Sequence, residues 1–337
     1  MKQVLVTGPG STAVIDVDRP AVSPRDVLVR VRACGICGSD GLYIAVGGIP
    51  PRRGATPIGH EPAGEICEVG DQVAGLTVGD HVVIDTMAAA DGFIGSGGAQ
   101  GALSEFLVIR DAEVGRQLVT VPAHVPFAVA ALNEPMAVAR HAVNRTNPKA
   151  GDRVVVFGAG PIGLGAAISY KLAGAHVVVA DILPGRLEKA LLVGADAVID
   201  SAREDTAARL IDLHGPGAAG STRGVRAGTD IYLDAAGVPA VLDTVTRTAK
   251  HGATLGIVAV HKNPVPIDLG TLLTTELTIA LAVGYPREIF EVTADIVRDW
   301  PRYAHIISDT VPFDEVSHAL TLATTPGAAD KVVVTFG

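Results

Sequence analysis

The sequence predicts an α/β protein in which a doubly wound parallel sheet is joined to a mainly-β module. Between residues 140 and 283, apolar runs alternate with Ala- and Leu-rich helical patterns, as in βαβαβ units. The chain before this stretch contains short β-type runs interrupted by Gly and Pro, and the chain after it contains both helical and strand patterns. We therefore expect one domain over residues 140–283 and a second made of residues 1–139 and 284–337.

The mainly-β part contains no long helical pattern. Its expected strands are 2–8, 26–35, 65–73, 79–86 and 104–111. The α/β part begins with "RVVVFG", a continuous apolar run typical of a parallel strand buried on both faces. The expected elements that follow are helices 161–175, 185–195 and 206–215 and strands 176–181, 197–200, 229–237 and 251–260. Residues 216–228 are expected to form a surface loop, and the tail to form helices 287–300 and 313–325 and strand 330–336.

Composition excludes several classes of protein. Of the 337 residues, 48% are hydrophobic and 19% are charged, which is typical of a compact globular chain of two domains. The net charge of -9 argues against nucleic acid or an anionic membrane as a partner. The N-terminal residues lack the pattern of a signal peptide, and no apolar run is long enough to span a membrane. Three cysteines are too few for a disulfide framework, so we expect a cytoplasmic protein.

A glycine-rich turn predicts a dinucleotide site. Residues 158–163, "GAGPIG", follow the first parallel strand and open a helix, which is the context that this motif requires. Gly158 is expected to make the tight turn, Gly160 to let the backbone approach the pyrophosphate, and Gly163 to let helix and strand pack closely. Pro161 and Ile162 open the helix, whose free N–H groups favour a diphosphate.

An acidic residue indicates which dinucleotide binds. Asp181 ends the next expected strand, 18 residues after Gly163. A carboxylate there accepts hydrogen bonds from the ribose hydroxyls and repels a 2'-phosphate, which favours NAD over NADP. Arg186 is expected near the adenine, where an arginine can also accommodate a phosphate and soften this preference.

Cysteines and a histidine predict a metal site in the first module. Cys34 and Cys37 form a C-x-x-C pair, but they lie outside the βαβαβ unit that a redox motif would occupy, and only one further cysteine is available for a structural zinc. A catalytic zinc needs three protein ligands and one open position. Cys37 and His60 supply two of them, and either Glu61 or Glu134 supplies the third.

The segment "GHEPAGEICEVGDQV" is similar to the zinc alcohol dehydrogenase pattern G-H-E-x2-G-x5-G-x2-V. "CGICGSD" resembles the zinc-cysteine segment of that family, and "NEPMAV" resembles a segment of its sorbitol and butanediol dehydrogenase branch. The order of modules is similar to that of medium-chain dehydrogenases over essentially the whole chain. The pattern is matched at Gly59, His60, Glu61, Gly64, Gly70 and Val73.

The resemblance implies a Rossmann NAD-binding domain and a GroES-like zinc domain. It implies that zinc is held by Cys37, by His60 and by either Glu61 or Glu134, and that hydride passes between NAD(H) and a secondary alcohol, vicinal diol or small polyol and its ketone. It further implies roles for three neighbouring residues in the order of the chain. Ser39 contacts the substrate and starts the proton relay, Asp40 holds the tautomer of the zinc-bound histidine, and Tyr43 either lines the substrate pocket or packs in the core.

The sequence departs from family members in several positions. Residues 85–106 lack the cysteines of a second, structural zinc, so we expect one zinc per subunit. Leu42 stands where some relatives end the proton relay with a histidine. Gly284-Tyr285 replaces the arginine–tyrosine pair that grips polyols in sorbitol dehydrogenases, which favours a butanediol-type substrate over a long polyol. Relatives are homodimers or homotetramers, and residues 270–284 are the expected interface.

The sequence leaves three alternative functions open. The chain resembles threonine and sugar dehydrogenases of the same zinc family as well. A zinc-free quinone or enoyl reductase is disfavoured because Cys37 and His60 are both present. A non-enzymatic metal-binding protein is disfavoured because Ser39 and the two glutamates are also in place.

Overall fold

A computed structural model describes residues 1–49, 55–217 and 224–337. The chain divides into two compact units, Met1–Glu134 with Ile289–Gly337, and Pro135–Glu288. The divisions fall at 134 and 289, where the sequence predicted 139 and 284.

The second unit is built on a parallel sheet with the strand order β11-β10-β9-β12-β13-β14. Its core combines residues of the apolar strands with residues of the helices packed against them, and β9 is central and buried along nearly its whole length. The sequence predicted this sheet from β9 to β13, and the fold class is confirmed. The strands are β9 (Arg153–Phe157), β10 (His176–Asp181), β11 (Ala197–Asp200), β12 (Ile231–Asp234), β13 (Thr254–Ile257) and β14 (Thr278–Leu281).

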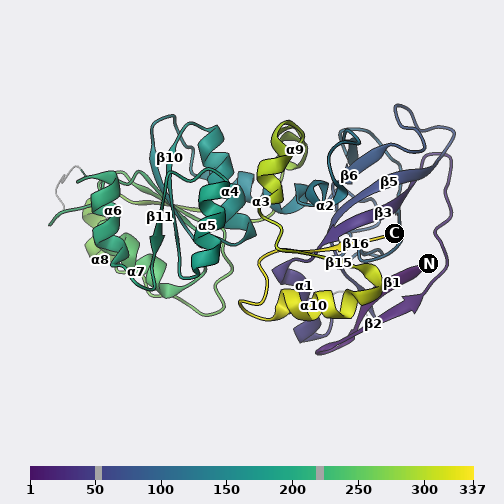
Figure 1. Cartoon of the computed structure of the whole chain (residues 1–337), viewed down its shortest axis with the longest axis horizontal. Coiled ribbons are helices and arrows are strands. Elements are labelled where there is room, and N and C mark those ends of the chain that lie inside the picture. Colours follow the sequence, from purple (N-terminus) through teal and green to yellow (C-terminus); the bar gives the residue numbers. More distant parts are fainter. Residues whose placement is uncertain (50–54, 218–223) are drawn as a thin grey trace. The chain divides into compact units, whose positions relative to one another are not determined.

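Helices cover both faces of this sheet. Figure 1 shows α4 and α5 on one face and α6 and α7 on the other, as a doubly wound sheet requires. Helix α7 was not predicted, because its many Val and Thr residues favour a strand. The helices are α3 (Asn133–Arg145), which begins in the first unit, α4 (Pro161–Leu172), α5 (Pro184–Leu192), α6 (Thr206–His214), α7 (Pro239–Thr248), α8 (Leu269–Leu272) and the 3₁₀ turn η1 (Leu273–Thr275).

The first unit contains two mainly antiparallel sheets. One has the order β2-β1-β4, and the other has the order β15-β16-β3-β5-β6-β8, with β7 also paired to β3. All five strands predicted for this module are present, although β5 begins four residues earlier than expected. The strands are β1 (Lys2–Gly8), β2 (Ser11–Asp16), β3 (Val27–Gly35), β4 (Thr56–Pro57), β5 (Glu61–Val69), β6 (His81–Ile84), β7 (Phe106–Ile109), β8 (Leu118–Thr120), β15 (Asp309–Pro312) and β16 (Val332–Thr335).

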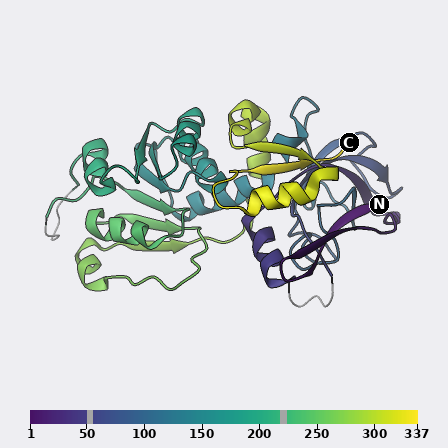
Figure 2. The ribbon, with the colours of Figure 1, turned by 60° about the horizontal axis from the view of Figure 1, so that its bottom comes forward.

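The C-terminal segment belongs to this first unit, as the sequence predicted. Strand β16 pairs antiparallel with β3, and Figure 2 shows the two side by side. The stacked rings of Phe313 and Phe336 join the last elements to the core. The remaining elements of this unit are α1 (Gly38–Val46), α2 (Phe127–Ala130), α9 (Ile289–Ala304), η2 (Phe313–Glu315) and α10 (Val316–Thr324).

Helix α1 is a short helix between strands of the first unit, where the sequence shows no long helical pattern. It begins directly after Cys37, whose backbone N–H donates to Asp40 Oδ2 at 2.9 Å. It ends at Gly47, which has the left-handed φ of 85° that favours glycine. The helix is therefore defined by its two caps rather than by hydrophobic periodicity.

Two predictions concern chain segments rather than elements. Among the described residues, no helix is long and apolar enough to cross a membrane. Residues 218–223 of the predicted surface loop lie outside the described residues, and the flanking chain is tied by a hydrogen bond from Gly217 N to Arg226 O.

Candidate metal centre and cofactor site

Three predicted metal ligands converge in the first unit. Cys37 precedes α1, and His60 and Glu61 lie where the chain enters β5. One ligand atom of each lies within 4.8 Å of the other two. His60 and Glu61 are buried and Cys37 is partly buried. In the described ranges, no other three His, Cys, Asp or Glu side chains come together in this way.

Asp40 joins the two chain segments that carry these residues. Its carboxylate accepts hydrogen bonds from Cys37 N at 2.9 Å and from Gly59 N at 3.2 Å, and Oδ1 lies 3.5 Å from His60 Nδ1. Burial by itself raises the pKa of Asp40, but the neighbouring His60 and these hydrogen bonds lower it below its ordinary value. A buried, ionised carboxylate therefore fixes the spacing between Cys37 and His60.

The histidine has one nitrogen on each side of the site. Nδ1 faces Asp40, and Nε2 lies 3.4 Å from Ser39 Oγ. Burial lowers the pKa of His60, but the Asp40 carboxylate outweighs this effect and raises the pKa well above its ordinary value. The site therefore stabilises a positive charge at this position.

Glu134 is the other carboxylate that the sequence predicted as a metal ligand. It lies in the first turn of α3, partly buried, and outside the group defined by the 4.8 Å limit. Burial raises the pKa of Glu134 to about 7, with His60 and Lys331 opposing the rise and Glu61 adding to it. The structure therefore groups Glu61 with the two other ligands and keeps Glu134 within electrostatic reach.

Lys331 is a residue of this site that sequence analysis missed. It is 3% exposed, it forms an ion pair with Glu61 Oε2, and its Nζ donates to Ile36 O at 3.1 Å. Burial lowers the pKa of Lys331, but the Glu61 carboxylate more than offsets this effect, so the pKa is raised. In the sequence, Lys331 is a charged residue before a short apolar strand, which indicates an exposed position.

The donor set fits zinc. Glu61 Oε1 is buried and has no hydrogen-bond partner among the described residues, so it has an unused acceptor next to Cys37 and His60. Thiolate, imidazole and carboxylate together are typical zinc ligands. A divalent cation would bind this oxygen and would supply the positive charge that the site favours beside His60.

Four of the seven predicted dinucleotide residues line a pocket of about 400 Å³ in the second unit. Gly158, Gly160 and Asp181 line it at the carboxyl ends of β9 and β10, and Arg186 lines it from α5. Strand β9 is the first strand of this sheet in sequence, and the strands that follow it are added on both of its sides. The carboxyl end of such a strand is the usual ligand site of a doubly wound sheet.

The three glycines of the turn differ in their surroundings. Gly158 has a φ of 94°, which favours glycine. A Cβ on Gly163 would lie 1.7 Å from Gly158 O, so the contact between α4 and the turn requires glycine. A Cβ on Gly160 would meet nothing within 4 Å, which leaves its backbone open to the pocket. Pro161 and Ile162 form the first turn of α4 and are partly buried.

Asp181 is buried at the end of β10 and is held by backbone N–H groups. Oδ2 accepts from Ala159 N at 2.7 Å, and Oδ1 accepts from Ile182 N and Leu183 N. The carboxylate thus links the glycine-rich turn to the next strand while lining the pocket.

Four other residues that the sequence analysis discussed lie outside the group of converging ligand atoms. Tyr43 is partly buried and packs against the core of the first unit, which agrees with the packing alternative. Leu42 is exposed on α1. Cys34 is fully buried, and burial raises the pKa of its thiol; Cys67 is partly buried and contacts Leu28 O.

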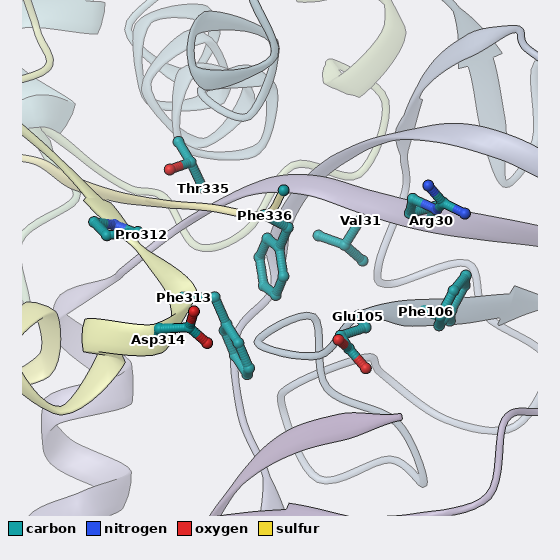
Figure 3. Close-up of a pocket in the computed structure, with 10 residues that line it drawn as sticks. Arg30, Val31, Glu105, Phe106, Pro312, Phe313, Asp314, Thr335 and Phe336 are labelled. Atoms are coloured by element: carbon teal, nitrogen blue, oxygen red, sulfur yellow. The ribbon is translucent and has the colours of Figure 1, made fainter.

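A further pocket of about 500 Å³ lies elsewhere in the first unit (Figure 3). Phe313 and Phe336 are stacked beside it, and Arg30, Glu105 and Asp314 add charged groups. None of the predicted site residues lines it, so it is separate from the metal centre.

Comparison with known proteins agrees with this geometry. Residues 23–123 match the family profile of the alcohol dehydrogenase GroES-like domain, and residues 161–299 match that of zinc-binding dehydrogenases. A (R,R)-butanediol dehydrogenase of Neisseria gonorrhoeae is 31% identical over 85% of this chain and 84% of its own, and a sorbitol dehydrogenase of Bacillus subtilis is 29% identical over 90% and 88%. The crystal structure of 2R,3R-butanediol dehydrogenase from Bacillus subtilis superposes with a TM-score of 0.85 at 26% identity, covering 99% of both chains.

The fold and the site together define a medium-chain oxidoreductase with a GroES-like domain and a Rossmann-type domain. The chain belongs to the zinc-containing alcohol dehydrogenase family, in its sorbitol and butanediol dehydrogenase-like branch.

Proposed function

We propose that this protein is an NAD-dependent zinc dehydrogenase that oxidises a secondary alcohol, a vicinal diol or a small polyol to the corresponding ketone, and reduces the ketone in reverse. The observation that carries the proposal is the convergence of Cys37, His60 and Glu61 within 4.8 Å, with a buried oxygen of Glu61 left without a partner among the described residues. A core role alone does not explain why these three donor atoms meet.

One zinc ion is held by Cys37, by His60 and by either Glu61 or Glu134. When bound, zinc supplies a Lewis acid that makes an alcohol more acidic, and NAD⁺ supplies the acceptor for hydride. Asp40 holds Nδ1 of His60 and so directs Nε2 to the ligand position. Ser39, whose Oγ is 3.4 Å from that nitrogen, binds the substrate hydroxyl and accepts its proton.

The second unit binds the cofactor. The diphosphate lies against the start of α4, at Gly158, Gly160, Pro161, Ile162 and Gly163, where free N–H groups and the helix dipole favour an anion.

The adenosine end of the same pocket sets the preference for NAD. Asp181 and Arg186 both line this pocket. The Asp181 carboxylate would accept from the ribose hydroxyls of the cofactor, and Arg186 would lie beside its adenine. A relative from Sinorhizobium meliloti, 27% identical with a TM-score of 0.82, was solved bound to NADP, so the preference rests on Asp181 in this chain rather than on the family.

The substrate is best sought among small vicinal diols. Relatives include the butanediol and sorbitol dehydrogenases and a putative D-xylulose reductase of Rhizobium meliloti that is 30% identical. A threonine-type substrate is the second candidate, because an L-threonine 3-dehydrogenase of Symbiobacterium thermophilum is also 30% identical, over 79% of this chain. Leu42 has no group that can accept a proton, so the relay that Ser39 starts ends in a group other than residue 42.

The protein acts as a homodimer or homotetramer in the cytoplasm. Strand β14 ends the parallel sheet and exposes Ile279 and Leu281, which suits pairing with a second copy through residues 270–284. Its three cysteines are all unpaired thiols, which suits a reducing compartment.

The test replaces one thiol at a time. Cys37→Ala should lose the zinc that the wild-type protein carries, about one ion per subunit for a single catalytic site. It should also lose NADH formation with butane-2,3-diol and other secondary alcohols. The matched control is Cys67→Ala, which removes a thiol outside the centre and should retain both zinc and turnover. Zinc and turnover retained in Cys37→Ala would overturn the proposed function.

A further inference from the structure

Lys331 carries a buried positive charge next to the proposed metal ligands. Lysine is almost never this buried unless it is paired. Here Nζ is paired with Glu61 Oε2 and donates to Ile36 O at 3.1 Å, so one carboxylate oxygen and one carbonyl hold it. Both partners belong to segments that also position the metal centre.

Three adjacent strands bring this pair together. In the pairing of β16 with β3, Val333 lies opposite Gly35, and in the pairing of β3 with β5, Gly35 lies opposite Glu61. Lys331 is two residues before Val333 and therefore faces the same side of the sheet. The pair thus lies directly over Gly35.

Gly35 has no side chain, and the pair occupies the space that a side chain there would fill. A Cβ at this position would lie 1.9 Å from Glu61 Oε2 and 3.0 Å from Lys331 Cε. Real atoms do not approach so closely, so any larger residue would displace the carboxylate from the ammonium. The missing side chain of Gly35 therefore provides the space in which Glu61 Oε2 faces Lys331.

This arrangement limits what Glu61 can offer to a cation. Oε2 is engaged, and only Oε1 is without a partner among the described residues. The adjacent ammonium also offsets part of the negative charge of the carboxylate. Glu134 interacts electrostatically with both Glu61 and Lys331 and is the second carboxylate near the centre.

We propose that Lys331 is a positioning residue of the metal centre: it holds Oε2 of Glu61 and so prevents that carboxylate from closing on the metal with both oxygens. The proposal rests on the proposed zinc function. It assigns a role to a side chain that touches neither substrate nor cofactor in the proposed mechanism.

The test uses Lys331→Met and Co²⁺ in place of zinc. In the variant, Glu61 is released from the ammonium and should bind the metal with both oxygens. Co²⁺ affinity, measured by competition with a chelator, should rise about tenfold or more, the scale on which partners of metal ligands act. The visible ligand-field bands of Co²⁺ should weaken, because an added oxygen raises the coordination number. Turnover number should fall with little change in KM.

Two further variants keep this result interpretable. Lys331→Arg keeps the positive charge and should keep the wild-type Co²⁺ spectrum. In a Glu61→Gln background there is no carboxylate to release, so adding Lys331→Met should change neither spectrum nor affinity. Lys2→Met is the matched control for loss of an exposed lysine in the same unit.

The outcomes are separable. A wild-type protein without the near-ultraviolet absorption of a cobalt–thiolate bond would overturn the proposed function itself. A wild-type protein with that absorption, together with an unchanged Lys331→Met, would overturn only the role of Lys331, as would an equal effect in the Glu61→Gln background. If Lys331→Met does not fold, Gly35→Ala displaces the same oxygen with both charges kept; it should weaken the same bands, and an unchanged spectrum would again overturn the proposal.

Discussion

His214 shows how burial sets the chemistry of a single residue. It is the last residue of α6 and is 2% exposed. The sequence indicated no role for it, because no local pattern distinguishes a buried histidine from an exposed one. Its Nδ1 lies 2.8 Å from Thr229 Oγ1, and its ring packs edge-on against that of His176. Burial, reinforced by the charges of His176 and Arg153, lowers the pKa of His214 to about 4.

This lowered pKa predicts a loss of stability in mild acid. A histidine in the unfolded chain has a pKa of about 6.5, so below that pH the unfolded state binds a proton that the folded state does not. Above pH 6.5 this group has no effect, and the free energy of unfolding falls as the pH drops from 6.5 to about 4. At pH 5 the loss is on the order of 2 kcal/mol.

Urea unfolding of the full chain at pH 7.5 and pH 5 measures this loss. His214→Gln should lose less stability between the two pH values than the wild type, by about the same 2 kcal/mol. The control is His124→Gln, which removes an exposed histidine and should behave as the wild type. Equal acid sensitivity in His214→Gln and in the wild type would contradict the assignment.

The metal centre contains residues that the sequence could predict and one that it could not. Cys37, His60 and Glu61 were predicted because each stands in a short motif, and the structure brings them together. Lys331 was not predicted, because it meets Glu61 across a sequence separation of 270 residues. Pairing of that range depends on the order of strands in the sheet, which no local pattern encodes.

At the scale of elements, caps and glycines decided where prediction succeeded. The helix α4 was expected because Pro begins it and glycine follows its end, whereas α1 was missed because its caps are a thiol-bearing residue and the loop glycine Gly47. The turn before α4 then places two glycines under opposite constraints. A Cβ on Gly163 would collide with Gly158 O at 1.7 Å, while a Cβ on Gly160 would meet only open space.

These two glycines make a matched pair of substitutions. Gly163→Ala should force α4 away from the turn and destabilise the protein by about 1–3 kcal/mol, the usual cost of overpacking. Gly160→Ala should leave stability unchanged, since its φ of -73° suits alanine, but weaken NAD binding because a methyl group enters the pocket. Urea unfolding and titration with NAD measure the two effects. An equal loss of stability in both variants would show that the close contact between Gly163 and Gly158 O does not determine the free energy of unfolding.

At the scale of the whole molecule, the fold class was predictable because the two units differ in period. The α/β unit alternates buried strands and helices, and the other unit consists of short antiparallel strands. The boundaries were less accurate, because one of them falls inside α3, where a helix continues across the division without a change in composition. The sequence predicted that the tail returns to the first unit but not that β16 pairs with β3, because the register of this pairing depends on residues about 300 positions apart in sequence.

The open edge of the parallel sheet makes a prediction for the assembled protein. Strand β14 lies at the end of the strand order and exposes Leu281 at 66%, with Ile279 and Val283 beside it. A sheet edge with exposed apolar side chains is prone to pair with another copy unless a charge prevents it. Leu281→Lys places such a charge there, so the mass in solution should fall from a multiple of 34.4 kDa toward that of one chain. Light scattering after size-exclusion chromatography measures this mass.

The control for that experiment is Leu192→Lys, on α5 of the same unit. Leu192 is about as exposed as Leu281, so both substitutions remove a similar apolar side chain and add one positive charge to an acidic protein. The control should keep the wild-type mass, because a helix surface offers no unpaired backbone groups to a second copy. A Leu281→Lys protein of wild-type mass, or a wild-type protein that is already a single chain, would exclude β14 as the edge that joins the copies.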